Sequence, residues 1–284
     1  MRLWAISDLH VSYRRNRERL AILAAYPEDW LIVAGDVAEE LDAFTDALRL
    51  LTARFAQLVW VPGNHDLWHG DDPRGLRGEA KYRKLVARCR DLGVLTPEDP
   101  YAFWPGEPGP HKIVPLFLLY DYTYAPEGLN RSEVIAWAQS SGVSSADERY
   151  LSPAPHESVQ AWCADRCAES ARRLEEERED LPTILINHWP LRQDLAVLPR
   201  IPRFSPWCGT TRTEDWHVRF EATAVVYGHL HIRRTQHRDG VRFEEVSLGY
   251  PRQYDAERPL DGYLREILPG PGPRDGAPLI SRYP

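Results

Sequence analysis

The chain has 284 residues and a formal net charge of −7 at pH 7, with 43% hydrophobic and 27% charged residues. These values are typical of a globular protein with a full hydrophobic core. The negative charge argues against a nucleic-acid-binding protein, which usually carries a basic excess. No apolar run is long enough to span a bilayer. The first apolar stretch is cut short by Asp8, so we expect no signal peptide and a cytoplasmic location.

The first third of the chain alternates between apolar runs typical of buried strands and segments typical of helices. In chain order, we expect a strand at Leu3–Ile6, a helix at Asn16–Ala25, a strand at Trp30–Ala34, a helix at Glu39–Arg54, a strand at Leu58–Val61, a helix at Glu79–Asp91 and a short strand at Val94–Thr96. The opening βαβαβ order predicts a parallel sheet with right-handed crossovers. Residues 97–110 are rich in Pro and Gly and predict a loop.

The rest of the chain adds further strands and a long amphipathic helix. We expect strands at Ile113–Leu119, Thr183–Ile186, Thr223–Tyr227, Ile232–His237, Val241–Val246 and Gly262–Leu268, and helices at Ser132–Gln139, Glu157–Glu179 and Glu214–Phe220. Residues 120–156 are first aromatic and then rich in Ser, and we expect an insertion that caps the functional site. Residues 269–284 predict a loosely ordered tail, and the whole chain, 1–284, is expected to form a single domain.

Five of the predicted strands are each followed directly by metal-ligand side chains. Open α/β sheets place their ligands outside the carboxyl ends of the strands, so these side chains are expected to gather at one edge. They are two aspartates, one asparagine and four histidines: Asp8, His10, Asp36, Asn64, His188, His229 and His231. Carboxylate, amide and imidazole ligands suit divalent Mn, Fe or Zn. Two such ions at about 3.5–4 Å are suited to phosphoester hydrolysis, and the sequence therefore predicts a metallohydrolase.

The order Asp-x-His, Gly-Asp-x-x-Glu, Gly-Asn-His-Asp, His and Gly-His-x-His resembles the calcineurin-like metallophosphoesterase superfamily, from Asp8 to His231. Any one of these motifs alone is a weak signal, whereas five in the same order are specific. The resemblance implies an α/β fold, a four-layer α/β/β/α sandwich with two mixed sheets. It also implies a dinuclear metal centre whose bridging hydroxide attacks the phosphoester.

The resemblance further implies a role for each motif residue. One metal would be bound by Asp8, His10 and His231, the second by Asn64, His188 and His229, and Asp36 would bridge them. His65 would be no ligand but a general acid, or a group that stabilises charge on the leaving-group oxygen. Asp66 is expected either to orient a neighbour or to cap the following turn. Glu39 is interpreted as an acidic residue at a helix start.

Several residues near the motifs are candidates for contact with the substrate, on the basis of their position alone. They are Arg14, Arg17, Trp68, His69 and Trp189. Arginine suits bidentate phosphate contacts, and the two tryptophans are expected to wall an apolar pocket unless they belong to the core. Cys163 and Cys167 are interpreted as small apolar residues on the buried face of a helix.

A narrower resemblance concerns the substrate. Met1–Val11 and the segment Asp239–Arg252 look like those of actinobacterial phosphopantetheinyl hydrolase-like metallophosphoesterases. The likeness implies a phosphodiesterase that removes 4′-phosphopantetheine from an acyl or peptidyl carrier protein, although Asp239–Arg252 has no residue of obvious catalytic type. A phosphomonoesterase or nucleotide hydrolase acting on a small metabolite is the alternative. A metal-binding scaffold for protein interactions is a second alternative, disfavoured because every ligand position and His65 are present.

Overall fold

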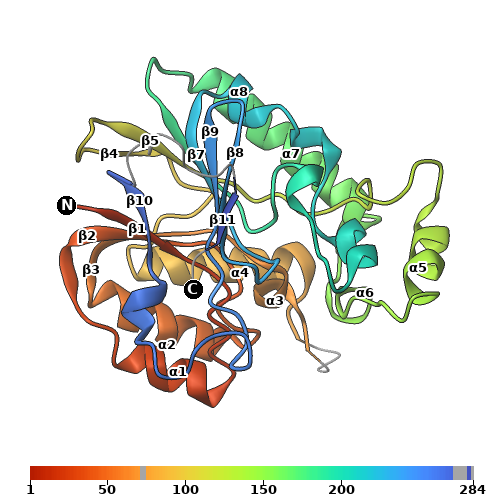
Figure 1. Ribbon diagram of the computed structural model, residues 1–284, viewed down its shortest axis with the longest axis horizontal. Coiled ribbons are helices and arrows are strands. Elements are labelled where there is room, and N and C mark those ends of the chain that lie inside the picture. Colours follow the sequence, from red (N-terminus) through yellow and green to blue (C-terminus); the bar gives the residue numbers. More distant parts are fainter. Residues whose placement is uncertain (71–74, 271–279, 283–284) are drawn as a thin grey trace.

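The computed structural model describes residues 1–70, 75–270 and 280–282, and they contain two mixed β-sheets packed face to face (Figure 1). The first sheet has the order β10-β1-β2-β3. Its strands are β1 (Leu3–Ile6), β2 (Tyr26–Val33), β3 (Phe55–Trp60) and β10 (Arg265–Leu268). β1, β2 and β3 are parallel, and β10 pairs antiparallel with β1. The predicted parallel start of the chain is confirmed.

The second sheet has the order β11-β8-β9-β7-β6-β5-β4. Its strands are β4 (Ala102–Trp104), β5 (His111–Pro115), β6 (Thr183–Ile186), β7 (Ala222–Tyr227), β8 (Arg234–Arg238), β9 (Val241–Glu245) and β11 (Ile280–Arg282). β5, β6, β7 and β9 run parallel, whereas β4, β8 and β11 pair antiparallel with their neighbours.

The core lies between the two sheets and beneath the helices. Alternate residues of the central strands, such as Ala5, Ile32 and Ile186, form an apolar layer between the sheets. Their neighbours, such as Ile6 and Val33, face the helices and belong to a second, larger cluster. Because these strands are buried on both faces, they appear in the sequence as continuous apolar runs.

Helices cover the outer faces of both sheets, which confirms the predicted α/β/β/α sandwich (Figure 1). The first sheet is flanked by α1 (Arg14–Ala21), α2 (Leu41–Thr52), α3 (Asn64–Leu67) and α4 (Gly78–Asp91), and the second by α7 (Val159–Glu176) and α8 (Trp216–Arg219). Short 3-10 helices lie at Gln193–Leu195, Pro202–Trp207, Thr211–Thr213 and Leu260–Tyr263. No helix in the described part of the chain is long and apolar enough to cross a membrane.

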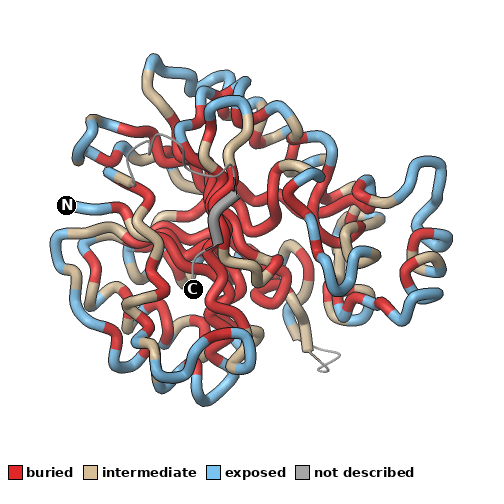
Figure 2. The backbone as a smooth tube through the Cα atoms, viewed as in Figure 1, coloured by how far each residue is buried: buried red, intermediate tan, exposed pale blue. Residues whose placement is uncertain are grey.

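Residues 120–156, for which we expect an insertion, carry α5 (Arg131–Gln139) and α6 (Asp147–Tyr150). α5 projects from the body of the protein and is largely exposed, whereas the body is buried at its centre (Figure 2). α6 turns back toward the sandwich, and its first residue, Asp147, is 1% exposed. α5 still buries Val134 and Ala138 in the hydrophobic core, whereas α6 brings a carboxylate, that of Asp147, into the interior.

One strand prediction is wrong in its end, and another is wrong altogether. The strand expected at Ile113–Leu119 ends at Pro115, because the amide of Leu118 donates to the side-chain oxygen of Asn187 (3.1 Å) instead of to a neighbouring strand. The strand expected at Val94–Thr96 is reduced to an isolated bridge between Val59 and Leu95.

Other predictions fail in part. The loop expected at 97–110 contains β4, which pairs with β5 across a turn that the local Pro and Gly residues favour. α2 begins at Leu41, so Glu39 precedes the helix. In the expected loose tail, Ile280–Arg282 pairs with β8 as strand β11, while residues 271–279 and 283–284 lie outside the described part of the chain.

Candidate metal centre

The predicted ligands gather where the carboxyl ends of strands from both sheets meet. Their donor atoms form three groups, each with all atoms within 4.8 Å of one another. The groups are Asp8, His10 and His231; Asp8, Asp36 and His188; and His10, Asp36 and His65. The first group is the set expected for one metal ion. The third brings His65, which we do not expect to be a ligand, into direct contact with two expected ligands.

The loops that carry the ligands have an unusual backbone conformation. Positive φ angles occur at Asp8 (53°), His10 (41°), Asp36 (55°), His229 (69°) and His231 (53°). Residues other than glycine rarely adopt this left-handed region, and each such residue costs about 1–3 kcal/mol. Strain of this kind is characteristic of functional sites, and here it recurs at most of the expected ligands.

The first ligand set is compact. Oδ1 of Asp8 lies 2.8 Å from Nε2 of His231 and 3.8 Å from Nε2 of His10, and the two imidazole nitrogens are 3.4 Å apart. All three atoms thus face a common point. Burial and the neighbouring His65 lower the pKa of His10 to about 3, so its imidazole is neutral at pH 7. The neutral form is the one that binds metals.

The second ligand set is organised by the amide of Asn64. Its Oδ1 lies 3.2 Å from Nε2 of His188 and 3.2 Å from Nδ1 of His229. Oδ2 of Asp36 is 3.5 Å from Nε2 of His188 and 3.9 Å from Nε2 of His10. Asp36 therefore lies between the two sets, as a bridging ligand requires. Carboxylate, amide oxygen and imidazole donors together fit divalent transition metals.

The second carboxylate oxygen of Asp8 is held by the protein. Oδ2 accepts hydrogen bonds from the hydroxyl of Ser7, the hydroxyl of Ser247 (2.8 Å) and the backbone N–H of His229 (3.1 Å). Oδ1 is left facing the first ligand set. These contacts fix the carboxylate in the orientation that a metal ligand needs.

Two ligand imidazoles are oriented in the same manner through their other nitrogen. Nδ1 of His188 donates to the carbonyl of Ala34 (2.8 Å), and Nδ1 of His231 donates to Oε1 of Gln253 (2.7 Å). With the proton on Nδ1, the lone pair of Nε2 points into the cluster. Such partners set the tautomer of a metal-binding histidine.

Asp66 joins the loop after β2 to the loop after β3. Its carboxylate accepts hydrogen bonds from the backbone N–H groups of Asp36 (3.0 Å), Val37 (2.8 Å), Ala38 (3.1 Å) and Gly63 (3.0 Å). Both roles considered from the sequence are thus combined, since the bond to Gly63 caps α3 and the others hold the loop of Asp36.

Two motif glycines are explained by close approach. A Cβ atom on Gly63 would lie 2.1 Å from Oδ1 of Asp36, and one on Gly35 would lie 2.6 Å from Nδ1 of His188. Gly35 also has a φ of +88°. Any side chain at these positions would push the ligands apart.

His65 is anchored beside the cluster rather than within either ligand set. Its backbone N–H donates to Oδ1 of Asp36 (2.8 Å), its Nδ1 donates to Oε1 of Glu39 (2.7 Å), and its ring packs on Trp68 at 3.6 Å. Burial would lower the pKa of His65, but the charges of Asp36 and Glu39 raise it. The imidazole can therefore hold a proton, as a general acid must.

Sequence reasoning missed the contact of Glu39 with His65. The signal was present, because Glu39 stands three residues after Asp36 in the Gly-Asp-x-x-Glu motif. We interpreted it as a residue that favours a helix start. The structure shows instead that its carboxylate binds a neighbouring imidazole and a hydroxyl, that of Ser12.

Asp147, on α6 of the insertion, was also missed. Its Oδ1 accepts hydrogen bonds from Nδ2 of Asn64 (2.9 Å) and Nε1 of Trp68 (2.7 Å). Because Nδ2 is held by Asp147, the amide oxygen of Asn64 must face His188 and His229. No local pattern singles out this aspartate, which lies 83 residues after Asn64.

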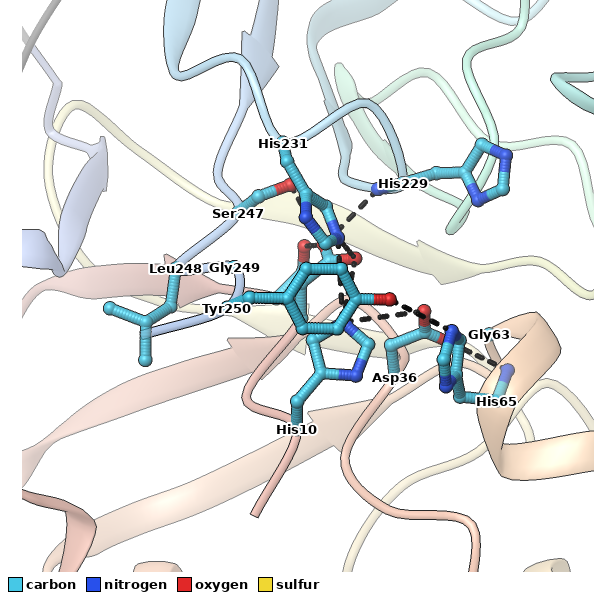
Figure 3. Close-up of polar contacts among 12 residues, drawn as sticks. His10, Asp36, Gly63, His65, His229, His231, Ser247, Leu248, Gly249 and Tyr250 are labelled. Carbon is cyan, nitrogen blue, oxygen red and sulfur yellow. Dashed lines mark hydrogen bonds and ion pairs between the residues drawn. The ribbon is translucent and has the colours of Figure 1, made fainter. Parts of the chain in front are cut away.

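The segment after β9 contributes three more residues to the site, of which Figure 3 shows Ser247 and Tyr250. Ser247 bonds Asp8, Gln253 bonds His231, and the ring of Tyr250 stacks on His10 at 4.6 Å. The hydroxyl of Tyr250 lies 3.4 Å from Nε2 of His65. The rule that led to the ligands, that side chains after parallel strands meet at one edge, applies equally to β9.

The five substrate candidates lie in three kinds of environment. Trp68 and His69 line a cavity of about 580 Å³ together with Glu39 and Lys81. Trp189 is fully buried and packs on the rings of His188 (5.0 Å) and His229 (5.7 Å), so it backs the ligands instead of facing an open pocket.

The two arginine candidates contact none of the expected ligands. Arg14 is exposed and pairs with Glu18 at 3.2 Å, and Arg17 donates to the carbonyl of Val11 at 3.2 Å. Their role stays a prediction.

Comparisons with known proteins identify the family of this chain. The family model described as calcineurin-like phosphoesterase matches residues 1–233. The chain is 49% identical over 272 residues to the [acyl-carrier-protein] phosphodiesterase PptH of Mycobacterium tuberculosis, covering 95% of this chain and 84% of that protein. It also matches the crystal structure of phosphopantetheinyl hydrolase (PptH) from the same organism with a TM-score of 0.90 and 48% identity, over 96% of this chain and 98% of that one. This chain therefore belongs to the calcineurin-like phosphoesterase family and is a hydrolase of phosphoester bonds.

Proposed function

We propose that this protein is a phosphodiesterase that removes 4′-phosphopantetheine from an acyl or peptidyl carrier protein. The observation that carries the proposal is the match to PptH of M. tuberculosis over almost the whole chain, at 49% identity and with a TM-score of 0.90. That relative is described as an acyl-carrier-protein phosphodiesterase. The match includes the segment after β9, which supplies Ser247, Tyr250 and Gln253 to the site.

We further propose that this protein binds two divalent metal ions, which are Mn, Fe or Zn. Asp8, His10 and His231 would hold one ion, Asn64, His188 and His229 the other, and Asp36 both. When bound, such a pair supplies an activated water and neutralises the charge of the phosphoryl oxygens. The support is the convergence of the donor atoms and the contacts that orient Asp8, His188 and His231.

His65 is the group proposed to protonate the leaving-group oxygen. Glu39 binds Nδ1, so Nε2 is the nitrogen that faces the site. The leaving group in the proposed reaction is the alkoxide of a carrier-protein serine, which is a strong base and needs a proton. A positioned acid typically accelerates such a step by about 10²–10⁴-fold.

The test is mass spectrometry of a purified holo carrier protein incubated with this protein and Mn²⁺, with Asp36→Ala as control. Loss of the phosphopantetheine mass with the wild type alone is the expected result. An unchanged holo protein, together with cleavage of a generic diester such as bis-p-nitrophenyl phosphate, would remove the carrier protein as substrate and leave the phosphoesterase activity.

The alternative of a phosphomonoesterase needs a cation that anchors a dianionic phosphate. Arg14 and Arg17 were the candidates, and both are engaged elsewhere, with Glu18 and with the carbonyl of Val11. Comparing the rates on p-nitrophenyl phosphate and its bis-ester separates the two activities. The cytoplasmic location expected from the sequence stays a prediction.

A further inference from the structure

Tyr250 lies beside the expected metal ligands but belongs to none of the family's motifs. The family model ends at residue 233, and Tyr250 follows β9 in the segment that distinguishes the narrower resemblance. Its ring stacks on His10 (4.6 Å, 25° between planes) and meets the edges of His231 (4.9 Å) and Tyr13 (5.4 Å). The ring is thus held between two expected metal ligands and a neighbouring tyrosine.

The hydroxyl of Tyr250 points toward Nε2 of His65 (Figure 3). The two atoms are 3.4 Å apart. A good hydrogen bond has a donor–acceptor distance of about 2.7–3.2 Å, so this separation is longer than usual. The contact is therefore weak and can be exchanged for stronger bonds to an acceptor between the two groups. A single acceptor oxygen can lie at hydrogen-bond distance, about 2.8 Å, from both the hydroxyl of Tyr250 and Nε2 of His65.

Both groups are suited to donate to such an oxygen. A phenol is protonated at neutral pH, with an ordinary pKa of about 10, and can donate one hydrogen bond. Because Glu39 occupies Nδ1 of His65, the remaining nitrogen is the one that acts toward the substrate. The acceptor that they would share is the ester oxygen that leaves with the alcohol.

We propose that the hydroxyl of Tyr250 donates a hydrogen bond to the leaving-group oxygen of the phosphodiester and thereby holds that oxygen against Nε2 of His65. The inference rests on the proposed phosphodiesterase activity, but not on the identity of the carrier-protein substrate. In the reaction, a water molecule gives one proton to the solvent while its oxygen forms a bond to phosphorus, and the bond from phosphorus to the leaving oxygen breaks. The electron pair stays on that oxygen, which takes the proton of His65, while Tyr250 keeps its own proton and His65 regains one from the solvent.

The role predicts a dependence on the leaving group. Charge develops on the leaving oxygen most strongly when the alcohol is a poor acid, and a donor that binds developing charge typically contributes about 10²–10³-fold to turnover. Phenolate needs this help more than p-nitrophenolate, which is stable as an anion. A contact of Tyr250 with a different phosphoryl oxygen would instead lower both rates equally.

The experiment compares wild type and Tyr250→Phe on diphenyl phosphate and bis-p-nitrophenyl phosphate, with Mn²⁺ content measured by elemental analysis. The substitution removes the hydroxyl and keeps the stacked ring. We expect unchanged metal content and melting temperature, a fall in kcat of about 10²-fold on diphenyl phosphate, a much smaller fall on the bis-p-nitrophenyl ester and little change in KM. Tyr13→Phe is the matched control, since its ring packs on Tyr250 and its side chain is 47% exposed.

A double variant supplies a second readout. If Tyr250 acts at the same oxygen as His65, His65→Ala/Tyr250→Phe should be little slower than His65→Ala alone, because groups that act as a unit are not additive. Equal losses on both diesters, additive losses in the double variant, unchanged turnover, or loss of metal in Tyr250→Phe would each overturn the inference. A wild type that cleaves both diesters but leaves a holo carrier intact would refute the proposed substrate and not the role of Tyr250.

Discussion

Replacing Asp147 with leucine should release the amide of Asn64 and weaken the second metal site. The carboxylate accepts from Nδ2 of Asn64 at 2.9 Å, which directs the amide oxygen to within 3.2 Å of both His188 and His229. A hydrogen bond to a charged group contributes about 1.5–3 kcal/mol. Without it, the amide can turn its nitrogen toward the imidazoles, and nitrogen of an amide does not bind metal.

The expected loss follows from that energy. Since about 1.4 kcal/mol corresponds to a tenfold change in affinity, the dissociation constant of one ion should rise about 10–100-fold, the range seen for partners of metal ligands. The other ion, proposed for Asp8, His10 and His231, should be retained. Removing the carboxylate also removes a buried oxygen, Oδ2, that has no hydrogen-bond partner among the described residues, which limits the loss of stability.

The assay is the Mn²⁺ content of the protein after dialysis against graded concentrations of free Mn²⁺. Wild type should fill two sites and Asp147→Leu only one over the lower part of the range. Asp147→Asn is the matched control, because its carbonyl oxygen can still accept from Asn64 and Trp68, and it should lose less than tenfold. Two sites of wild-type affinity in Asp147→Leu would refute the argument that Asp147 sets the orientation of Asn64.

Further outcomes follow from the other contacts of the site. Asp36→Ala should lower metal content and activity together, and normal metal content would show that Asp36 is no bridging ligand. His65→Ala should keep both metals but reduce turnover by about 10²-fold or more, and wild-type turnover would exclude its role as acid. Glu39→Gln should reduce kcat with metal content unchanged, by weakening the bond that orients His65, and equal kcat values would contradict this. Asp66→Ala should lower the free energy of unfolding by about 2–5 kcal/mol, measured with urea, because four backbone N–H groups lose their acceptor.

The gathering of the expected ligands at one edge could be predicted from the strand pattern, whereas the four-layer sandwich was predicted from the family resemblance. Strands buried on both faces are visible as apolar runs, and residues at their carboxyl ends, such as Asp8, Asp36 and His188, share one edge whatever the intervening loops do. The ends of helices and strands were predicted less accurately, because hydrogen bonds from side chains distant in the sequence determine where an element ends. The end of β5 is an example, since Asn187, from the next strand's loop, takes the amide of Leu118.

The residues that orient the ligands could not be found in the same way. Asp147 reaches Asn64 through the fold of residues 120–156, so this contact has no local pattern. Glu39 does belong to the Gly-Asp-x-x-Glu motif, but its contact with His65 was missed because an acidic residue there also suits a helix start. Ser247, Tyr250 and Gln253 could have been predicted from the rule that side chains after parallel strands meet at one edge of a sheet. Their segment directly follows the expected strand Val241–Val246, at the edge where the loops of the expected ligands begin.

The left-handed backbone at Asp8, His10, Asp36, His229 and His231 has a consequence for attempts to change the metal preference of the site. Aspartate, asparagine and histidine are, after glycine, the residues that tolerate this conformation best. The expected ligands are therefore suited both to a metal ion and to the turns on which they lie. Exchanging one of them for a glutamate or a cysteine would supply an adequate donor atom on a backbone that resists it. We expect metal selectivity to be easier to alter at Asn64 and His188, whose φ angles are not positive, than at the five expected ligands with a left-handed backbone.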